Sequence, residues 1–441
     1  MDRRHLLLAT GALATATLAG CLSDDGTEPD DTADDGIDNP SGEPRARPDI
    51  PEAELSALAA DNAAFGMELY RRLGAEDADN LFLSPYSISV ALAMTYAGAR
   101  GETATQMEET LRFTDGQHVH PIFGALQHEL TAREETEDQV MGADEEPESV
   151  DAFKLRIANA LWGREGEQFA EAFVELVADY YGAGLAEADF MGDPEGERER
   201  INGWVADQTE ERITELLPPG SIDANTVLVL TNAIYFLASW QSEFDPADTA
   251  EETFHTLDDG ESSVPFMYQN LRTPYAALDD LEALELPYVG EEVSMVLILP
   301  QADAFEAVES SLDGDRLLEI FDALGDYTGD LYLPNFEVET EFALSEVLMD
   351  LGMEIPFGDG ADFSGMFEHG GAGVFIDDVY HDAFVTIDEE GTEAAAATAV
   401  VMSESAPPDW GELRFDRPFI FCIRDRPTNS VLFLGRITDP A

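Results

Sequence analysis

The chain has 441 residues, 44% of them hydrophobic, which is enough to form a large core. It carries 93 acidic residues against 22 basic ones, a formal net charge of −71, and Lys154 is its single lysine. A surface of this charge repels nucleic acid and anionic membranes and offers no basic helix to a heparin-like polyanion, which excludes these partners. Because molar salt screens such self-repulsion, we expect a salt-saturated habitat, as for a halophilic archaeon; an ordinary acidic protein is the alternative.

Residues 1–20 have the composition of an export signal. Arg3 and Arg4 precede an apolar run over 6–18, which is too short to span a bilayer as a mature helix. The arginine pair resembles a twin-arginine signal, and Leu-Ala-Gly-Cys at 18–21 resembles a lipobox. The resemblance implies a lipid on Cys21 and a protein anchored on the outer face of the cell membrane. The alternative is a plain secretory signal with an incidental cysteine, and thus an extracellular protein.

The rest of the chain divides into a tether and one domain. Residues 21–51 are rich in Asp, Gly, Pro and Thr, and predict an acidic disordered tether, whereas 52–441 form a single domain. Apolar spacing predicts helices over 54–73, 86–97 and 170–181, and strands over 227–236, 293–299, 329–338, 415–423 and 430–436. We expect an exposed loop over 134–148 and a buried structural thiol at Cys422. The order of these elements indicates a large α+β domain.

Catalytic motifs are missing from the sequence. It contains no G-x-S-x-G elbow, no H-E-x-x-H motif and no phosphate-binding G-x-x-x-x-G-K-S/T loop. Its single lysine argues against Schiff-base chemistry. His118, His120 and His128 form the one histidine cluster, which we interpret as a solvated surface rather than a weak metal site. The sequence therefore predicts no enzyme, no cofactor and no metal.

The segment 387–398, Ile-Asp-Glu-Glu-Gly-Thr-Glu-Ala-Ala-Ala-Ala-Thr, has an unusual composition. Its alanines favour helix, so one interpretation is a buried Ala-rich helix. The other is a segment that inserts as a strand between two existing strands, for which Gly391 would be the pivot. The strand period of two gives this segment one face without charge, made up of Thr392, Ala394, Ala396, Thr398, Val400 and Met402.

This segment resembles the reactive-loop hinge of inhibitory serpins almost residue for residue. Five further stretches resemble the same family in the same order: 80–89, 231–240, 362–366, 415–421 and 433–436. His381 matches the family histidine that precedes the hinge strand. The resemblance covers 52–441 and implies the serpin fold, with a large central β-sheet, two further β-sheets, eight or nine helices and an exposed reactive-centre loop.

The resemblance also assigns roles to residues of this sequence. The residues of the polar shutter network beneath the central sheet would be Ser84, Ser87, Asn232 and His381. Trp240 would mark the breach, where insertion begins. The hinge would comprise Glu389, Glu390, Gly391, Thr392, Glu393, Ala394, Ala395, Ala396, Ala397 and Thr398.

The function implied by the resemblance is inhibition of a serine protease by a suicide-substrate mechanism. The protease would cut the loop, and insertion of the hinge would trap the acyl-enzyme; the inhibitor itself would be a monomer. Counting from the hinge places the reactive bond at Ser405–Ala406, while Glu404–Ser405 and Met402–Ser403 remain open. No Lys or Arg occurs between Gly391 and Leu413, which favours a subtilisin-like or elastase-like target.

Three other functions are compatible with parts of the sequence. A non-inhibitory serpin would act as a binding module, and some serpins inhibit cysteine proteases instead of serine proteases. A Ser–His–Asp enzyme would need Ser84 or Ser87 to be accessible to solvent beside His381.

Overall fold

The computed structural model describes residues 44–75, 79–134, 137–141, 147–151, 154–258, 260–369, 373–392 and 408–441. All of them belong to one compact unit, Ile37–Ala441. Cys21, the hinge from Glu393 onward and the bond predicted at Ser405–Ala406 lie outside the described residues. The description of the hinge therefore ends at Thr392.

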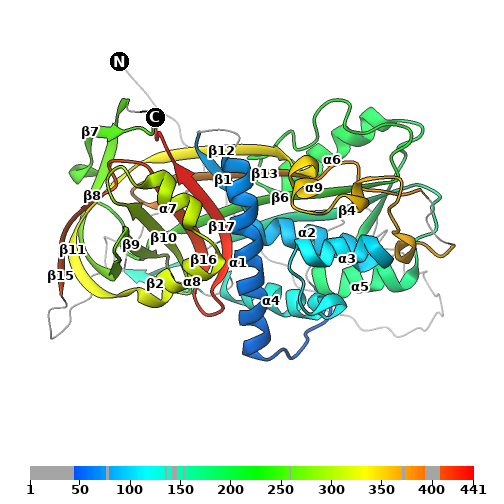
Figure 1. Ribbon diagram of the computed structural model, residues 1–441, viewed down its shortest axis with the longest axis horizontal. Coiled ribbons are helices and arrows are strands. Elements are labelled where there is room, and N and C mark those ends of the chain that lie inside the picture. The colour runs from blue at the N-terminus through cyan, green and yellow to red at the C-terminus, as the bar shows by residue number, and fades with distance from the viewer. Residues whose placement is uncertain are drawn as a thin grey trace, which may run out of the picture. The chain divides into compact units, whose positions relative to one another are not determined.

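The described residues form helices and sheets, which together confirm the predicted α+β class. The helices are α1 (Glu52–Gly74), α2 (Pro85–Gly98), α3 (Gly101–Thr110), α4 (Val119–Glu134), α5 (Glu171–Tyr181), α6 (Pro194–Gln208), α7 (Phe305–Ser311), α8 (Gly314–Ala323) and α9 (Ser345–Asp350) (Figure 1). Helix α2 is buried on every face, and its N-terminus is fixed by local chemistry. Pro85 occupies the first turn, and the Ser84 hydroxyl accepts the Ser87 N–H.

Two large sheets share the remaining chain (Figure 1). The central six-stranded sheet has the order β12 (Phe336–Ala343), β13 (Tyr380–Ile387), β14 (Gly391–Thr392), β6 (Leu228–Ser239), β4 (Lys154–Arg164) and β5 (Leu185–Ala188). The nine-stranded sheet comprises β1 (Leu81–Leu83), β17 (Ser430–Ile437), β16 (Phe419–Asp425), β10 (Val293–Pro300), β9 (Leu281–Pro287), β8 (Glu261–Ala277), β11 (Gly325–Pro334), β15 (Asp409–Arg414) and β7 (Ala250–His255). Strands β2 (Glu137–Met141) and β3 (Pro147–Asp151) form a third, two-stranded sheet.

Three local predictions differ from the structure. The run 329–338 is not one strand, because β11 ends at Pro334 and β12 begins at Phe336 in the other sheet. The apolar alternation changes phase at Asn335, and the prediction of one strand overlooked this signal. In the run 415–423, the strand begins only at Phe419, directly after Pro418, which lacks the N–H that a ladder needs. The acidic stretch 134–148 is not all loop, because backbone pairing forms β2 and β3.

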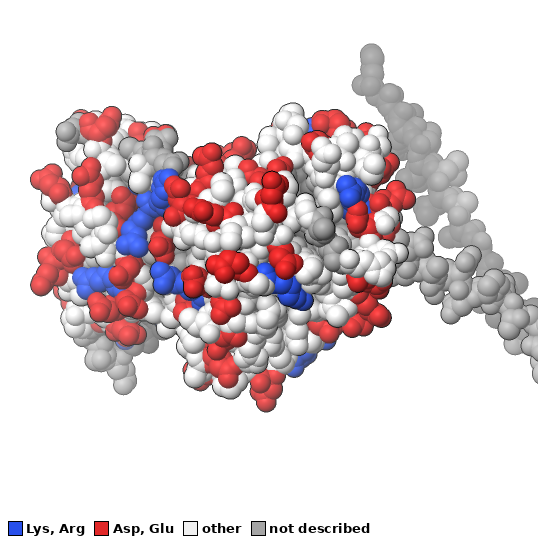
Figure 2. Space-filling view, turned by 45° about the vertical axis from the view of Figure 1, so that its right-hand side comes forward, with Lys and Arg blue, Asp and Glu red and all other residues white. Residues whose placement is uncertain are grey.

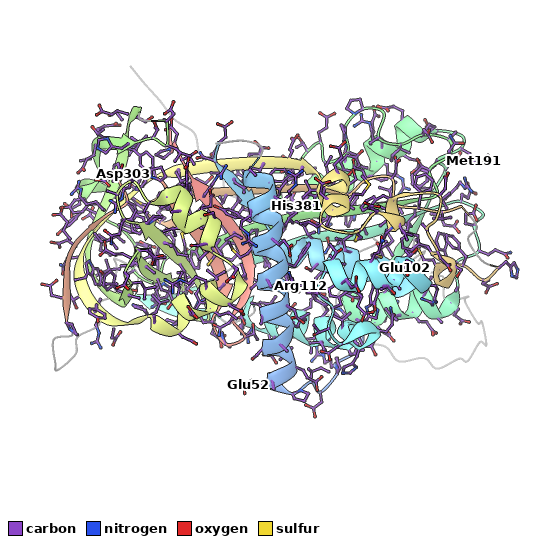
Figure 3. All side chains as sticks on the ribbon, in the orientation of Figure 1. Glu52, Glu102, Arg112, Met191, Asp303 and His381 are labelled. Carbon is purple, nitrogen blue, oxygen red and sulfur yellow. The ribbon has the colours of Figure 1, made fainter. Side chains whose placement is uncertain are left out.

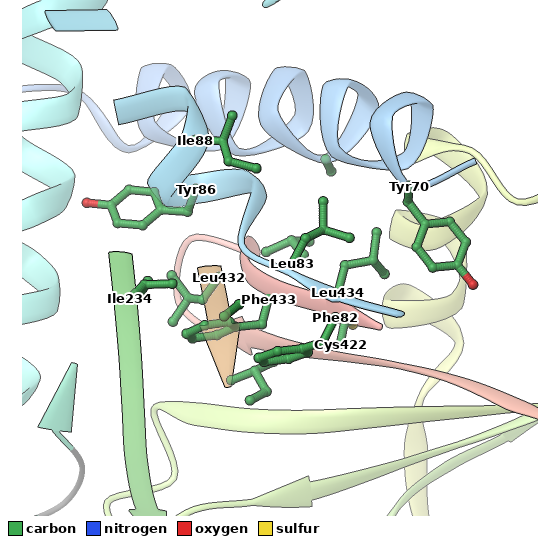
Figure 4. Close-up of a cluster of buried hydrophobic side chains, with 14 of the residues drawn as sticks. Tyr70, Phe82, Leu83, Tyr86, Ile88, Ile234, Cys422, Leu432, Phe433 and Leu434 are labelled. Carbon is green, nitrogen blue, oxygen red and sulfur yellow. The ribbon is translucent and has the colours of Figure 1, made fainter. Parts of the chain in front are cut away.

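A single core joins the two large sheets beneath α2. Phe82 of β1 stacks on Phe433 of β17, with ring centroids 5.1 Å apart. Ile234 of β6 and Cys422 of β16 reach the same cluster (Figure 4). Cys422 is fully buried, as predicted, and burial raises the pKa of its thiol to about 12, so it is an inert structural residue. The helix and both sheets consequently stabilise one another.

The surface is dominated by carboxylates. Figure 2 shows Asp and Glu spread over one face, with few Lys or Arg side chains between them. Several arginines pair with acids, such as Arg112 with Glu68 at 2.7 Å and Arg316 with Asp280 at 3.0 Å. Within the described ranges, no helix has both the length and the apolar composition needed to cross a bilayer.

This charge predicts a salt-dependent stability. The Debye length falls from about 10 Å at 0.1 M salt to about 3 Å at 1 M, which screens repulsion between surface carboxylates. Raising KCl from 0.1 M to 3 M should therefore raise the Tm, followed by calorimetry. The steepest rise is expected below about 1 M, where screening changes most. A Tm that is independent of KCl would contradict the role given to charge repulsion.

Candidate functional site

The predicted shutter residues meet in one buried hydrogen-bond network beneath the central sheet. His381 of β13 lies beside Asn232 of β6, with 2.6 Å between Nδ1 and Oδ1. The Ser84 N–H donates to His381 Nε2 at 3.1 Å, and Asn232 Nδ2 donates to Ser87 Oγ at 2.6 Å. All four residues are at most 1% exposed, and the label in Figure 3 marks the position of His381 in the fold. The network therefore joins α2 to two strands of the sheet.

The hydrogen bonds fix the protonation state of His381. A backbone N–H can only donate, so Nε2 must accept from Ser84, and Nδ1 must carry the proton that it donates to Asn232. Burial lowers the pKa of His381 to about 3. A second proton, on Nε2, would place an N–H donor opposite the Ser84 N–H donor, and this hydrogen bond would be lost. The network is therefore complete only with a neutral imidazole.

The sheet is already open at one end. Strands β13 and β6 pair directly and in parallel over Tyr380–Phe384 and 231–235. Above this stretch β14 lies between them, antiparallel to both, with Thr392 opposite Ala238 of β6 and Ile387 of β13. The first two residues after the 388–390 turn are consequently a central strand of the sheet, and further insertion would have to separate β13 from β6.

Trp240, the predicted breach residue, packs at this open end. Its ring stacks on Tyr288 with centroids 4.6 Å apart, and its Nε1 donates to the Asp388 carbonyl at 3.0 Å. The Tyr288 hydroxyl lies 2.8 Å from Thr392 Oγ1, so the same stack holds the buried start of the hinge. The backbone N–H of Trp240 also donates to the Glu390 carbonyl, at 3.0 Å. These contacts fix β14 between its neighbours.

The structure explains why two positions of the predicted hinge carry Glu and Gly, namely Glu389 and Gly391. The carboxylate of Glu389 accepts hydrogen bonds from Thr249 at 2.6 Å and Asn335 at 3.2 Å. Gly391 has a φ of 151°, and a Cβ there would lie 2.3 Å from the Ala238 carbonyl oxygen. Only glycine meets both conditions without displacing β6.

The network is unsuited to catalysis. Ser84 and Ser87 are fully buried, which removes the accessibility that a Ser–His–Asp enzyme would need. An amide, Asn232, rather than a carboxylate holds His381 Nδ1. The three clustered histidines also bind separate partners, since His118 lies near Glu54, His120 contacts Tyr181 and Gln117, and His128 contacts the Ala46 carbonyl. His120 is buried, so the interpretation of a solvated surface is wrong for this residue.

Two further residues of the site were not predicted. Asn159 of β4 accepts the second hydrogen bond of Asn232 Nδ2 at 2.8 Å and extends the network across three strands. Tyr288 follows β9 directly. The polar Asn159 within the apolar run 157–162 is a signal that could have been read, whereas the contact between Tyr288 and Thr392 spans 104 residues and leaves no local trace.

The buried imidazole predicts a loss of stability in acid. Its folded pKa of about 3 lies below the unfolded value of about 6.5, so the unfolded chain takes up the extra proton between these values. Through His381 alone, the free energy of unfolding should fall by about 1.4 kcal/mol for each pH unit in this window, and the buried His120, with a pKa lowered to about 4, adds to the loss. His381→Gln should flatten the pH dependence of the Tm, whereas the exposed His255→Gln should leave it unchanged. Equal slopes in the two variants would contradict the assignment.

The geometry at Gly391 predicts a local clash. Gly391→Ala adds a Cβ that overlaps the Ala238 carbonyl and should expel β14, destabilising the chain by about 1–3 kcal/mol. Denaturant unfolding measures the loss, and proteolysis of the segment after 388 should accelerate. Gly220→Ala is the matched control, because Gly220 also has a positive φ but no atom near the added Cβ. A loss no larger than that of the control would contradict the clash.

Two curated relatives match nearly the whole described unit. An uncharacterised serpin-like protein of Thermococcus kodakarensis is 37% identical over 99% of this chain and 99% of its own length. The leukocyte elastase inhibitor of Bos taurus is 37% identical over 88% of this chain and 100% of its own length.

Solved structures show the same fold. The native state of the thermophilic serpin tengpin superposes with a TM-score of 0.76 at 28% identity, covering 90% of this chain and 97% of tengpin. Thyroxine-binding globulin in complex with thyroxine gives a TM-score of 0.73 at 29% identity, covering 87% of this chain and all of that one. The family model described as serpin (serine protease inhibitor) matches residues 60–440. With this match, these relatives and the fold just described, the chain belongs to the serpin family.

Proposed function

We propose that this serpin inhibits a serine protease as a suicide substrate, by cleavage of its loop and insertion of the cut segment into the central sheet. The observation that carries the proposal is β14, which already lies between β13 and β6 and sets the direction in which a longer strand would grow. The family is one of protease inhibitors, and the segment after Thr392 has one face free of charge. Each added residue would extend an existing ladder.

The register of β14 specifies where the inserted residues would lie. Thr392 is opposite Ala238, so continuing the antiparallel pairing brings Thr398 opposite Asn232 of β6. On the other side Thr392 is opposite Ile387, and the same extension brings Thr398 opposite His381 of β13. Thr398 would thus enter between the two residues whose side chains now contact each other. Its small hydroxyl side chain can donate and accept there, which compensates for the broken pair.

The same extension favours the bond at Ser405–Ala406. Met402 would lie opposite Leu228, the first residue of β6, so Thr392–Met402 would fill the length of that strand. Residues 403–405 would then project past its end and connect the sheet to the acylated protease. Cleavage after Met402 would instead place the acyl bond at the strand end, with no spacer. We therefore propose Ser405 as the acylated residue, in a loop without Lys or Arg that suits a subtilisin-like or elastase-like protease.

The proposed setting is the outer face of the cell membrane in concentrated salt. The export signal and the cysteine at position 21 support a lipid anchor, and the 21–51 tether would separate the domain from the bilayer. The net charge of −71 supports a halophilic, archaeal source, because concentrated salt screens the repulsion between surface carboxylates. In this position, a monomeric inhibitor would meet extracellular proteases, and its membrane contact would be through the lipid alone.

The experiment that tests inhibition uses the full exported chain in 3 M KCl. It is mixed with a subtilisin-like and an elastase-like protease, and a covalent complex that survives denaturing electrophoresis is expected. The N-terminus of the released C-terminal peptide identifies the bond and should be Ala406. Cleavage without a complex would favour a non-inhibitory serpin, and a complex only with a papain-like cysteine protease would overturn the target class.

A substitution at Thr398 tests the insertion register. Thr398→Arg places an unpaired charge against the buried amide of Asn232, which should block insertion and turn the inhibitor into a substrate. The stoichiometry of inhibition should rise by at least about tenfold, since blocking costs more than about 1.4 kcal/mol. Thr398→Ser keeps the hydroxyl and should retain the wild-type stoichiometry. Unchanged inhibition by the arginine variant would show that the register is different.

A further inference from the structure

The outer face of the β12–β13 pair carries three carboxylates in contact range. Glu339 and Glu341 extend from β12 and Asp382 from β13, and one carboxylate oxygen of each lies within 4.8 Å of the others. Glu341 is directly opposite Asp382 in the antiparallel register. Like charges in this position destabilise a pair of strands unless something compensates them.

Asp382 is an independent reason to expect a ligand at this position. It is 3% exposed, although both glutamates beside it are exposed. Its Oδ1 is buried and has no hydrogen-bond partner. A buried carboxylate without a partner is costly, and native proteins satisfy such groups with a cation or a hydrogen-bond donor.

The negative charges of the three groups also favour a bound cation. Burial is the largest cause that raises the pKa of Asp382, to about 7, and the charges of Glu341 and Glu339 add to it. The guanidinium of Arg212 lies over the ring of Phe384, two residues further along β13, with its carbon 5.5 Å from the ring centre. No arginine is among the causes that shift the pKa of Asp382.

We propose that Glu339, Glu341 and Asp382 bind a calcium ion. All donors are carboxylate oxygens, which hard cations prefer. Calcium–oxygen distances of about 2.3–2.6 Å put ligands on opposite sides of the ion about 4.6–5.2 Å apart, compatible with the 4.8 Å limit on the three oxygens. Magnesium demands strict octahedral geometry at about 2.0–2.1 Å and keeps most of its waters, so a group of three carboxylates suits the more adaptable calcium better. Water can complete the coordination from the exposed side of the glutamates.

The ion would link β12 to β13, and β6 would contribute no ligand atom to it. The pairing that must break for insertion lies between β13 and β6, on the other edge of β13. Calcium would therefore keep the edge strand β12 and its neighbour β13 together as one unit, both before and after the loop enters. The site does not depend on the proposed function, since its ligands and its effect on stability are the same in a serpin that never inhibits.

The test measures calcium binding to the full chain at constant ionic strength. The protein is stripped with a chelator in 3 M KCl, and equilibrium dialysis with radioactive calcium should show one saturable site. Calcium should raise the Tm by several degrees at saturation, and magnesium at the same concentration should raise it less. Asp382→Asn and Glu341→Gln should lose the site. Glu337→Gln is the matched control, because Glu337 lies on the same face of β12 but pairs with Thr386.

The order of stabilities separates calcium binding from a purely structural role. In chelator, Asp382→Asn should be at least as stable as the wild type, because it removes a buried charge. In calcium, the wild type should be the more stable of the two. A calcium response that Asp382→Asn and Glu337→Gln share with the wild type would overturn the proposal and indicate diffuse binding to the acidic surface. The absence of any saturable site in the wild type would overturn it as well.

Discussion

The hydrogen bond between His381 and Asn232 is the interaction on which the rest of this structure depends. It crosses the seam where β13 and β6 pair directly, and its two residues also hold α2 through Ser84 and Ser87. The imidazole can make both of its bonds only while it is neutral, and its burial secures that state. A sheet closed by one buried polar pair, rather than by apolar packing alone, can part there if an incoming side chain supplies equivalent bonds.

The two ends of the seam are different in kind. At the open end, Tyr288 stacks on Trp240 and contacts the Thr392 hydroxyl. Gly391 allows the backbone to pass within contact distance of β6. Below it, the direct pairing of β13 and β6 opposes any further entry. The start of the strand is therefore committed to the sheet, while its continuation requires the exchange of one set of ladder hydrogen bonds for another.

The sequence predicted the fold class, the helices α1, α2 and α5, and the strands with uninterrupted apolar character, because these follow from periodicity and the order of the elements. It did not predict α4 or α6, although both are longer than α2. It also identified His381, Asn232 and the serines, through a family resemblance rather than through their chemistry. The prediction of one strand over 329–338 overlooked the change of apolar phase at Asn335, where the chain passes from one sheet to the other. Asn159 and Tyr288 were missed because their roles arise from contacts between distant segments. The carboxylates of β12 and β13 likewise become a group only when the strand register is known.

The position of β14 also sets the length of travel in the proposed mechanism. The strand now ends its described course at Thr392, and β6 continues for ten further residues, from Ala238 down to Leu228. A strand advances about 3.3 Å per residue, so a segment that fills this track carries its cut end about 33 Å along the sheet. A protease attached to that end would be moved by a distance comparable to the diameter of a small domain. The length of β6 thus determines how far from its point of attack the bound enzyme comes to rest.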